Sequence, residues 1–296
     1  MNTPKGPTTV RLKNVLYLTN FSRSSETALR LAAAVGRKYG AKVYALHVVV
    51  PGIYGEGTSE LEAMPIQAKE EAALEEFRRV GSQFIGLDHE VLEEHGLGVW
   101  MIVEKKIQDR RIDLLVLGTR GRNGVRKLAW GSLAGEIFGR SPVPILSIGP
   151  AVQSGGADFR RILFVTDFTP DAAYAIPYAV SLARENDARL ILAHVMPHPG
   201  AKKSDRPREM SVAEVIHHLY EMVPKDANLP LRPEVAVEFG KTSEQIVKAA
   251  KERNIHLIVL GVRCERGYRG STTHFGGDIA QQVAACSPCP ILTIRA

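Results

Sequence analysis

The chain has 296 residues, of which 45% are hydrophobic and 24% are charged, a composition typical of globular proteins and long enough for two domains. No apolar run reaches the roughly 18–20 residues of a membrane-spanning helix, and the N-terminus carries no apolar stretch typical of a signal peptide. We therefore expect a cytoplasmic protein without a membrane partner. The net charge of +6 is spread over both halves, which argues against a dedicated nucleic-acid-binding protein.

The first half alternates strand and helix patterns along the chain. Residues 14–19 are a short apolar run that predicts a strand buried on both faces. Residues 24–38 place small and aliphatic side chains on one face of a helix, which we expect to end near Gly40. The patterns that follow predict a strand at residues 41–48, a helix within a long connection at residues 60–83, and strands at residues 112–118 and 143–148.

The second half repeats the first. Blocks at residues 14–22, 41–48, 112–118 and 141–148 match, in the same order, blocks at residues 161–169, 188–195, 255–261 and 287–294. Helical patterns occupy residues 171–185 and 211–223. Matching blocks in one order indicate duplication of a whole domain. We expect domains at residues 11–150 and 158–296, joined by a glycine-containing linker at residues 149–158.

The alternation of short apolar strands with helices predicts an α/β fold. Each domain should form a doubly wound parallel sheet of five strands. In such a sheet ligands bind outside the carboxyl ends of the strands, where the strand order reverses. We place that point between the first and fourth strands of the first half, which would bring Asn20 and Gly118 side by side.

The loop after the fourth strand has the spacing G-x2-G-x9-G-S, formed by Gly118, Gly121, Gly131 and Ser132. Glycines let backbone N–H groups approach phosphate oxygens closely. A helix that opens at Gly131 and Ser132 would direct free amides and its positive dipole end at an anion. Basic side chains that could neutralise phosphate charge lie in the same loop: Arg120, Arg122, Arg126 and Lys127. The alternative is a glycine-rich surface loop that only turns the chain.

At these residues the chain resembles the universal stress protein family, whose ATP-binding members carry the same glycine spacing. The resemblance covers nearly the whole chain twice. It includes the Thr-Asn/Asp-Phe-Ser/Thr sequence that ends the first strand of each half. It implies an adenine nucleotide α-hydrolase-like fold. Members of single-domain length commonly dimerise through the edge of the last strand, so the resemblance also implies two halves packed as a pseudo-dimer.

The resemblance further implies an ATP site in the first domain, with or without Mg²⁺. The implied nucleotide-binding residues are Leu18, Thr19, Asn20, Val48, Leu117, Gly118, Arg120, Gly121, Arg122, Gly131, Ser132 and Leu133. Leu18, Thr19, Val48 and Leu117 would line the adenine, partly through backbone groups. Asn20 stands where ATP-binding relatives usually have aspartate. An amide can accept a hydrogen bond from a ribose hydroxyl or donate one to the base, but it carries no charge.

The second half departs from the pattern in its loop. Asp167 keeps the aspartate, but Cys264 replaces the second glycine and Asp278 stands where Ser132 stands. A carboxylate about 4 Å from a phosphate charge costs roughly 4 kcal/mol at an effective dielectric constant near 20. We therefore expect one nucleotide site in the first half and a degenerate one in the second.

Two pairs of residues with metal-binding side chains have simpler interpretations. Cys286 and Cys289 have the spacing of a redox or zinc pair, but no second pair accompanies them, which favours buried or half-buried thiols. His47 and His194 occupy equivalent strand ends in the two halves, which favours a structural position over a ligand role.

Lys241 and Thr242 look like the end of a phosphate-binding Walker loop after a strand. The opening glycine of such a loop would fall at position 235, which is Val235. Thr242 and Gln245 have the spacing of a capping box, which we expect to begin the next helix.

The leading hypothesis is a cytosolic stress-response protein that binds ATP or a related adenine nucleotide and acts as a regulator or chaperone-like binder. No residue of the first site is an obvious general base, so we expect at most weak ATP hydrolysis. The alternatives are a structural module of the same family that binds proteins and no nucleotide, and a nucleotide-using enzyme of a related fold. The sequence leaves open a homo-oligomer and the identity of any protein partner.

Overall fold

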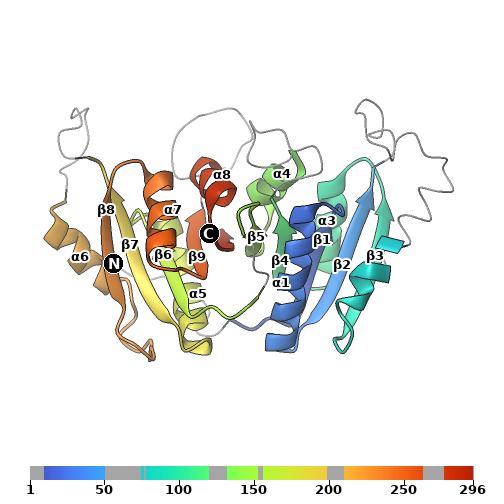
Figure 1. Cartoon of the computed structure of the whole chain (residues 1–296), viewed down its shortest axis with the longest axis horizontal. Coiled ribbons are helices and arrows are strands. Elements are labelled where there is room, and N and C mark those ends of the chain that lie inside the picture. The colour runs from blue at the N-terminus through green and yellow to red at the C-terminus, as the bar shows by residue number, and fades with distance from the viewer. Residues whose placement is uncertain are drawn as a thin grey trace. The chain divides into compact units, whose positions relative to one another are not determined.

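The computed structural model describes residues 10–50, 75–76, 78–119, 132–152, 156–198, 210–262 and 277–295. Strands and helices alternate through these residues (Figure 1). The elements of the first half are β1 (Asn14–Thr19), α1 (Arg23–Tyr39), β2 (Lys42–Val49), β3 (His89–His95), α3 (Val99–Asp109), β4 (Leu114–Gly118), α4 (Ser132–Arg140) and β5 (Ile145–Ile148). Of the helix predicted at residues 60–83, residues 75–76 and 78–82 are described and are helical, and residues 60–74 lie outside the described part.

The second half repeats this order without a break in the pattern. Its elements are β6 (Arg161–Val165), α5 (Pro170–Glu185), β7 (Arg189–Met196), α6 (Val212–Glu221), β8 (Glu234–Phe239), α7 (Thr242–Glu252), β9 (Leu257–Val262), α8 (Gly277–Cys286) and β10 (Ile291–Arg295). The duplication inferred from the sequence is therefore a duplication of structure.

The chain forms two compact units. One comprises Arg11–Ile137 with Gly155–Ala157, and the other includes Phe138–Ser154 and Asp158–Ala296, so one boundary falls within α4. The first unit holds the parallel strands β3-β2-β1-β4 in that order. The second unit holds the order β5-β10-β9-β6-β7-β8, in which the recorded pairs are parallel except that of β5 with β10. This is the predicted α/β fold with mostly parallel strands.

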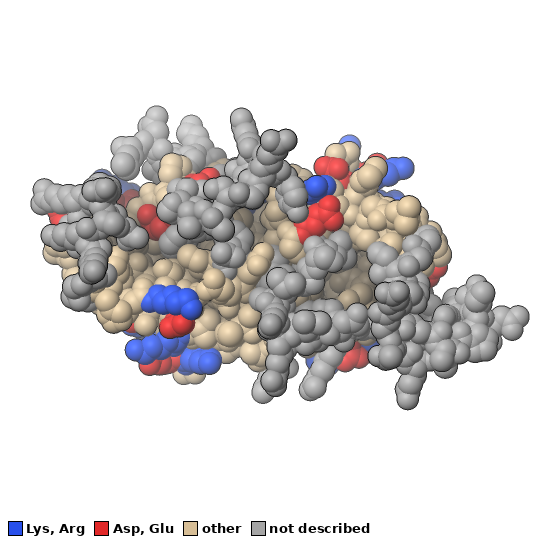
Figure 2. Space-filling view, turned by 90° about the horizontal axis from the view of Figure 1, so that it is seen from above, with Lys and Arg blue, Asp and Glu red and all other residues tan. Residues whose placement is uncertain are grey.

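The central strands are buried on both faces, which explains their continuous apolar sequences. Val15 and Leu16 of β1 and Leu163 and Phe164 of β6 have no solvent exposure. Surface charges of both signs lie beside one another on the described part of the face that Figure 2 shows. Among the described helices, none has the length and apolar character needed to cross a membrane.

The two final strands, β5 and β10, pair with each other inside the second unit. They run antiparallel, with Ile291 opposite Ser147 and Thr293 opposite Ile145. The Ser147 hydroxyl donates to the carbonyl of Ile291 at 3.3 Å, and the Thr293 hydroxyl donates to the carbonyl of Ile145 at 3.4 Å. Equivalent residues of the two repeats thus make reciprocal bonds. The prediction that the two final strands meet is confirmed.

Removing one of these hydroxyls should weaken the pairing measurably. Thr293 is almost fully buried, so Thr293→Val should lower the free energy of unfolding by roughly 0.5–1.5 kcal/mol through the lost hydrogen bond. Urea unfolding monitored by circular dichroism measures this change. Thr293→Ser keeps the hydroxyl and separates its effect from that of the methyl group. A valine variant as stable as the parent chain would contradict the prediction.

Candidate functional site

The crevice predicted from the sequence would lie at the carboxyl ends of β1 and β4. These strands are parallel neighbours, with Leu18 opposite Leu117. The chain leaves β1 through α1 toward β2 on one side, and β4 lies on the other side, so the strand order reverses between β1 and β4. Residues 19–20 and 118–119, which come after this pair, therefore lie at the same edge of the sheet, as predicted.

Gly118 lets the end of β4 approach the first turn of α1. A Cβ at position 118 would lie 2.6 Å from the carbonyl carbon of Ser24 and 2.7 Å from its oxygen. Gly261, its equivalent at the end of β9, lies against α5 in the same way, and a Cβ there would be 2.3 Å from the carbonyl oxygen of Asp171. This glycine therefore has a packing role in both repeats, in addition to any role toward a ligand.

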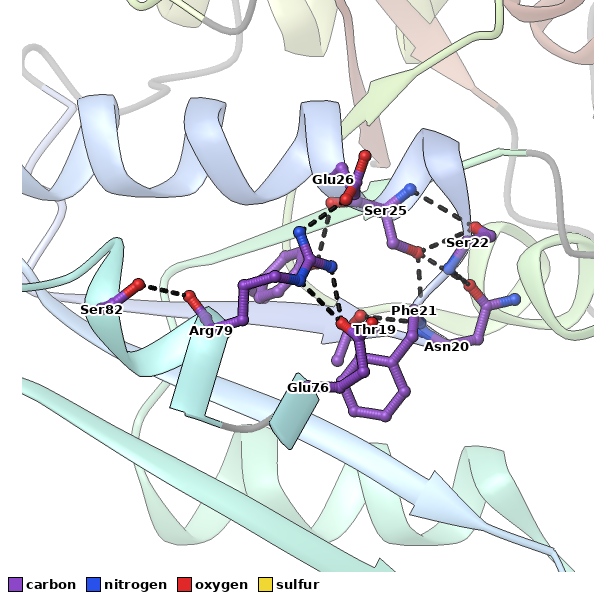
Figure 3. A network of polar contacts seen from close by, with 10 residues as sticks. Thr19, Asn20, Phe21, Ser22, Ser25, Glu26, Glu76, Arg79 and Ser82 are labelled. Carbon is purple, nitrogen blue, oxygen red and sulfur yellow. Dashed lines mark hydrogen bonds and ion pairs between the residues drawn. The ribbon is translucent and has the colours of Figure 1, made fainter. Parts of the chain in front are cut away.

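Asn20 closes a tight polar turn between β1 and α1, drawn in Figure 3. Its Oδ1 accepts hydrogen bonds from the backbone N–H of Ser22 at 3.2 Å and from the hydroxyl of Ser25 at 2.8 Å. Ser22 is the N-cap of α1, and its hydroxyl accepts from the backbone N–H of Ser25. The turn is therefore rigidly specified by short polar side chains, and Asn20 itself remains exposed.

The second repeat builds the same turn with a carboxylate. Asp167 Oδ1 accepts from the backbone N–H of Thr169 at 3.0 Å and from the Thr169 hydroxyl at 2.5 Å. Thr169 is the N-cap of α5, as Ser22 is of α1. The two positions thus differ in the second terminal atom of the side chain, which does not bond within the turn. It is an oxygen in Asp167 and an amide nitrogen in Asn20.

A phenylalanine in the left-handed region follows in both turns. Phe21 has φ 57° and Phe168 has φ 62°, an uncommon conformation for a bulky residue. Each ring packs on a histidine, with centroids 4.5 Å apart for Phe21 and His47 and 4.7 Å apart for Phe168 and His194. These contacts stabilise the strained backbone directly after the first strand of each repeat.

The two histidines also bind the backbone of the first strand of each repeat. His47 Nδ1 lies 2.9 Å from the carbonyl oxygen of Thr19, and His194 Nδ1 lies 2.8 Å from that of Thr166. A carbonyl only accepts, so Nδ1 carries the proton and donates. Burial lowers the pKa of His194, which favours its neutral form. The equivalent contacts agree with the predicted structural position.

The residues expected around the adenine lie at or near the ends of β1, β2 and β4. Leu18, Thr19 and Leu117 are buried, and Val48 near the end of β2 is half-buried. The Thr19 hydroxyl accepts from the backbone N–H of Phe21 at 3.0 Å, so it is engaged within the turn.

The predicted phosphate loop lies mostly outside the described residues, namely Arg120, Gly121, Arg122, Arg126, Lys127 and Gly131. Ser132 and Leu133 are described as helical residues of α4, and the residues directly before them lie outside the described part. In the second repeat Cys264 is outside the described part, and Asp278 is the second residue of α8.

Sequence reasoning missed an ion-pair cluster beside the turn. Arg79 contacts Glu26 of α1 at 2.5 Å through Nη1 and Glu76 at 2.8 Å through Nε (Figure 3). The hydrogen bond to Glu76 raises the pKa of Arg79. The buried Tyr17 hydroxyl donates to the carbonyl of Ser25 at 2.7 Å, and burial raises the Tyr17 pKa. Glu76 and Arg79 have the i,i+3 spacing of a helical ion pair, but no spacing in the sequence connects them to Glu26 or Tyr17.

The prediction of buried or half-buried thiols is confirmed for Cys289 and wrong for Cys286. Cys286 is exposed and Cys289 is buried. Burial raises the pKa of the Cys289 thiol to about 11, which opposes thiolate formation. The part of the chain that the structure describes contains no group of three His, Cys, Asp or Glu side chains placed to hold a metal ion.

The predicted capping box of Thr242 and Gln245 is wrong. The N-cap of α7 is Lys241, which makes no side-chain capping bond, and Thr242 is already inside the helix. A capping box occurs instead at α6, between Ser211 and Glu214. A capping box requires its first residue to be the N-cap, and the spacing of Thr242 and Gln245 alone does not reveal that α7 begins one residue earlier.

Comparison with known proteins gives one consistent family. A sequence model of the universal stress protein family matches residues 11–148 and again residues 158–295. One repeat, 46% of this chain, is 27% identical to universal stress protein MJ0531 of Methanocaldococcus jannaschii over 81% of that protein. An equal share is 27% identical to universal stress protein YxiE of Bacillus subtilis over 99% of that protein.

Solved structures agree over both repeats. A universal stress protein from Archaeoglobus fulgidus superposes with a TM-score of 0.68, covering 95% of this chain and 98% of its own. Its sequence is 20% identical, so this similarity concerns the fold.

Proposed function

Because the chain belongs to the universal stress protein family, we propose that its first repeat binds ATP or a related adenine nucleotide at the carboxyl ends of β1 and β4. In this proposal the protein is a cytosolic stress-response regulator or chaperone-like binder. The second repeat, with a carboxylate at position 278 of α8, is the weaker or inactive copy.

The observation that carries the proposal is that the Asn20 turn and Gly118 lie at the ends of neighbouring parallel strands, at one sheet edge. The Asn20 turn leaves β1, Gly118 ends the neighbouring β4, and α4 begins at Ser132 after the loop that leaves β4. A helix N-terminus after a glycine-rich loop presents unpaired backbone N–H groups and the positive end of the helix dipole. This combination suits a phosphate chain.

The proposed pose assigns each part of the nucleotide to a different element. The phosphates face the loop and the first turn of α4, through Gly121, Gly131, Ser132 and Leu133, with charge neutralised by Arg120 and Arg122. The adenine lies against Leu18, Thr19, Val48 and Leu117. Val48 is half-buried and the other three side chains are buried, which leaves mainly backbone groups to recognise the base. Asn20 and Gly118, at the ends of the two central strands, flank the ribose.

The proposed site is built for binding. The polar groups of the turn at positions 20, 22 and 25 are an amide and two hydroxyls, which bond one another. None of these is a base near neutral pH, so activation of a water molecule would be inefficient. We therefore propose weak hydrolysis at most.

A titration of three ligands tests the proposal. ATP, AMP and adenosine are each titrated into the purified chain by calorimetry, with Mg²⁺ and then with EDTA. ATP should bind at least about tenfold more tightly than adenosine, because the helix dipole, the amides and the basic side chains act on phosphate. Rising salt should reduce this preference, since exposed charges are screened within roughly 8–10 Å.

Two outcomes would contradict the proposal. Equal affinity for the three ligands would mean that the glycine loop does not hold phosphate. Absence of binding by all three would leave a protein-interaction module of the same fold.

A further inference from the structure

The turn after the first strand occurs twice, and in each copy the chemistry fixes which side-chain atom faces inward. In the first repeat the backbone N–H of Ser22 lies 3.2 Å from one terminal atom of Asn20. A backbone N–H only donates, so this atom must be the amide oxygen. The equivalent N–H of Thr169 lies 3.0 Å from Asp167 Oδ1. The inward position is therefore an oxygen in both repeats.

A hydroxyl secures the same oxygen in each copy. Ser25 donates to Asn20 Oδ1 at 2.8 Å, and Thr169 donates to Asp167 Oδ1 at 2.5 Å. With two donors on the inward oxygen, rotation of the Asn20 amide by half a turn would place its NH₂ group against a backbone N–H. The outward atom is consequently Nδ2 of Asn20 in the first repeat and Oδ2 of Asp167 in the second.

These outward atoms are available to a ligand. Within the described part of the chain, neither Asn20 Nδ2 nor Asp167 Oδ2 takes part in a hydrogen bond or an ion pair, and Asn20 is exposed. Figure 3 shows the Asn20 nitrogen directed away from the network that holds the oxygen. Asparagine and aspartate have nearly the same shape, so the two turns differ in polarity and charge.

We propose that the first repeat presents a hydrogen-bond donor to the nucleotide ribose and therefore accepts adenine nucleotides whose ribose carries a phosphate ester. The second repeat presents a carboxylate at the same place and would repel such a ligand. This inference rests on the proposed function, because the pose proposed there places the ribose beside Asn20.

The selectivity follows from what each outward atom can bind. A free ribose hydroxyl can donate to a carboxylate or accept from an amide, so it suits either side chain. A phosphate ester on the ribose offers only acceptor oxygens and negative charge. It can accept from Asn20 Nδ2, whereas a carboxylate would face it with like charge and no donor.

The test compares AMP with adenosine 3′,5′-bisphosphate and adenosine 2′,5′-bisphosphate, which keep the base and the 5′-phosphate and add a phosphate to the ribose. Affinities are measured by calorimetry for the full chain, for Asn20→Asp, for Asn20→Ala and for Asp167→Asn. The ratio of bisphosphate to AMP affinity is the quantity of interest. A substitution that weakens the whole site lowers both affinities alike and leaves this ratio unchanged.

At least one bisphosphate should bind the parent chain as tightly as AMP or more tightly. Asn20→Asp should lower that ratio by at least about tenfold through charge repulsion, and Asn20→Ala should lower it less, through the lost donor alone. Asp167→Asn, the matched change in the other repeat, should leave the ratio unchanged. In ¹⁵N spectra the Asn20 side-chain amide signal, identified by its loss in Asn20→Asp, should shift more with the bisphosphate than with AMP.

Three results would overturn the inference, and one of them would also remove the proposed function. If AMP binds while both bisphosphates bind more than tenfold more weakly, the ribose pocket excludes the ester. If Asn20→Asp weakens all ligands equally, position 20 has only a structural role. If the parent chain binds none of these ligands and no ATP, the nucleotide site itself is absent.

Discussion

Ser132→Asp should abolish ATP binding by this chain. Ser132 is the first residue of α4, where the proposed phosphate site meets the positive end of the helix. A carboxylate about 4 Å from a phosphate charge costs roughly 4 kcal/mol at an effective dielectric constant near 20, equivalent to about a thousandfold loss of affinity. Calorimetric titration with ATP measures the loss.

The two repeats supply the controls. Ser132→Ala removes the hydroxyl without adding charge and should cost about tenfold or less. Gly277→Asp introduces a carboxylate at the start of α8 in the second repeat and should leave ATP binding nearly unchanged. Loss of binding by Gly277→Asp and not by Ser132→Asp would mean that the second repeat holds the nucleotide.

Gly118→Ala should destabilise the first unit strongly for a change of one methyl group. The new Cβ would lie 2.6 Å from the carbonyl carbon of Ser24, and the obstructing atoms include the backbone of α1. The helix or the strand must shift, which typically costs about 1–3 kcal/mol in a packed core. Urea unfolding should show this as a lower midpoint for the unit that contains β1 and β4.

The control for Gly118→Ala is Gly135→Ala in α4, at a glycine where an added methyl group has room. A Cβ at position 135 would meet no atom within 4 Å. Alanine is a better helix former than glycine, so this variant should gain about 0.5–1 kcal/mol of stability. If both variants behaved alike, the close approach of β4 to α1 would not be the cause of the Gly118 effect.

Much of the fold could be predicted because its signals are local and occur twice. The apolar run of β1 and the helical pattern of α1 indicated their elements directly, and the matching blocks of β6 and α5 supported them independently. The strand order reversal also followed from the alternation, since parallel strands joined by helices have few possible arrangements. The neighbouring of β1 and β4, between which the strand order reverses, was therefore accessible from the sequence.

The chemistry of the site was harder to predict from the sequence, because it depends on which side-chain atoms already form hydrogen bonds within the protein. The sequence shows Asn20, but it leaves open whether its oxygen or its nitrogen faces a ligand. The backbone N–H of Ser22 decides this, because it can only donate and lies 3.2 Å from the Asn20 oxygen. In the same way, Gly118 was interpreted only as a phosphate-loop glycine, although its contact with Ser24 requires glycine without any ligand.

The pairing of β5 with β10 also determines how the association of the two strands depends on protein concentration. Both strands belong to one polypeptide, so their association is unimolecular and does not follow mass action. Diluting the protein cannot separate them, whereas the same antiparallel pairing between separate chains would dissociate at low concentration. Because the strands are encoded separately, a substitution at Ser147 is not copied at Thr293, as it would be in a symmetric dimer. The same independence allows asparagine at position 20 and aspartate at position 167 in one molecule.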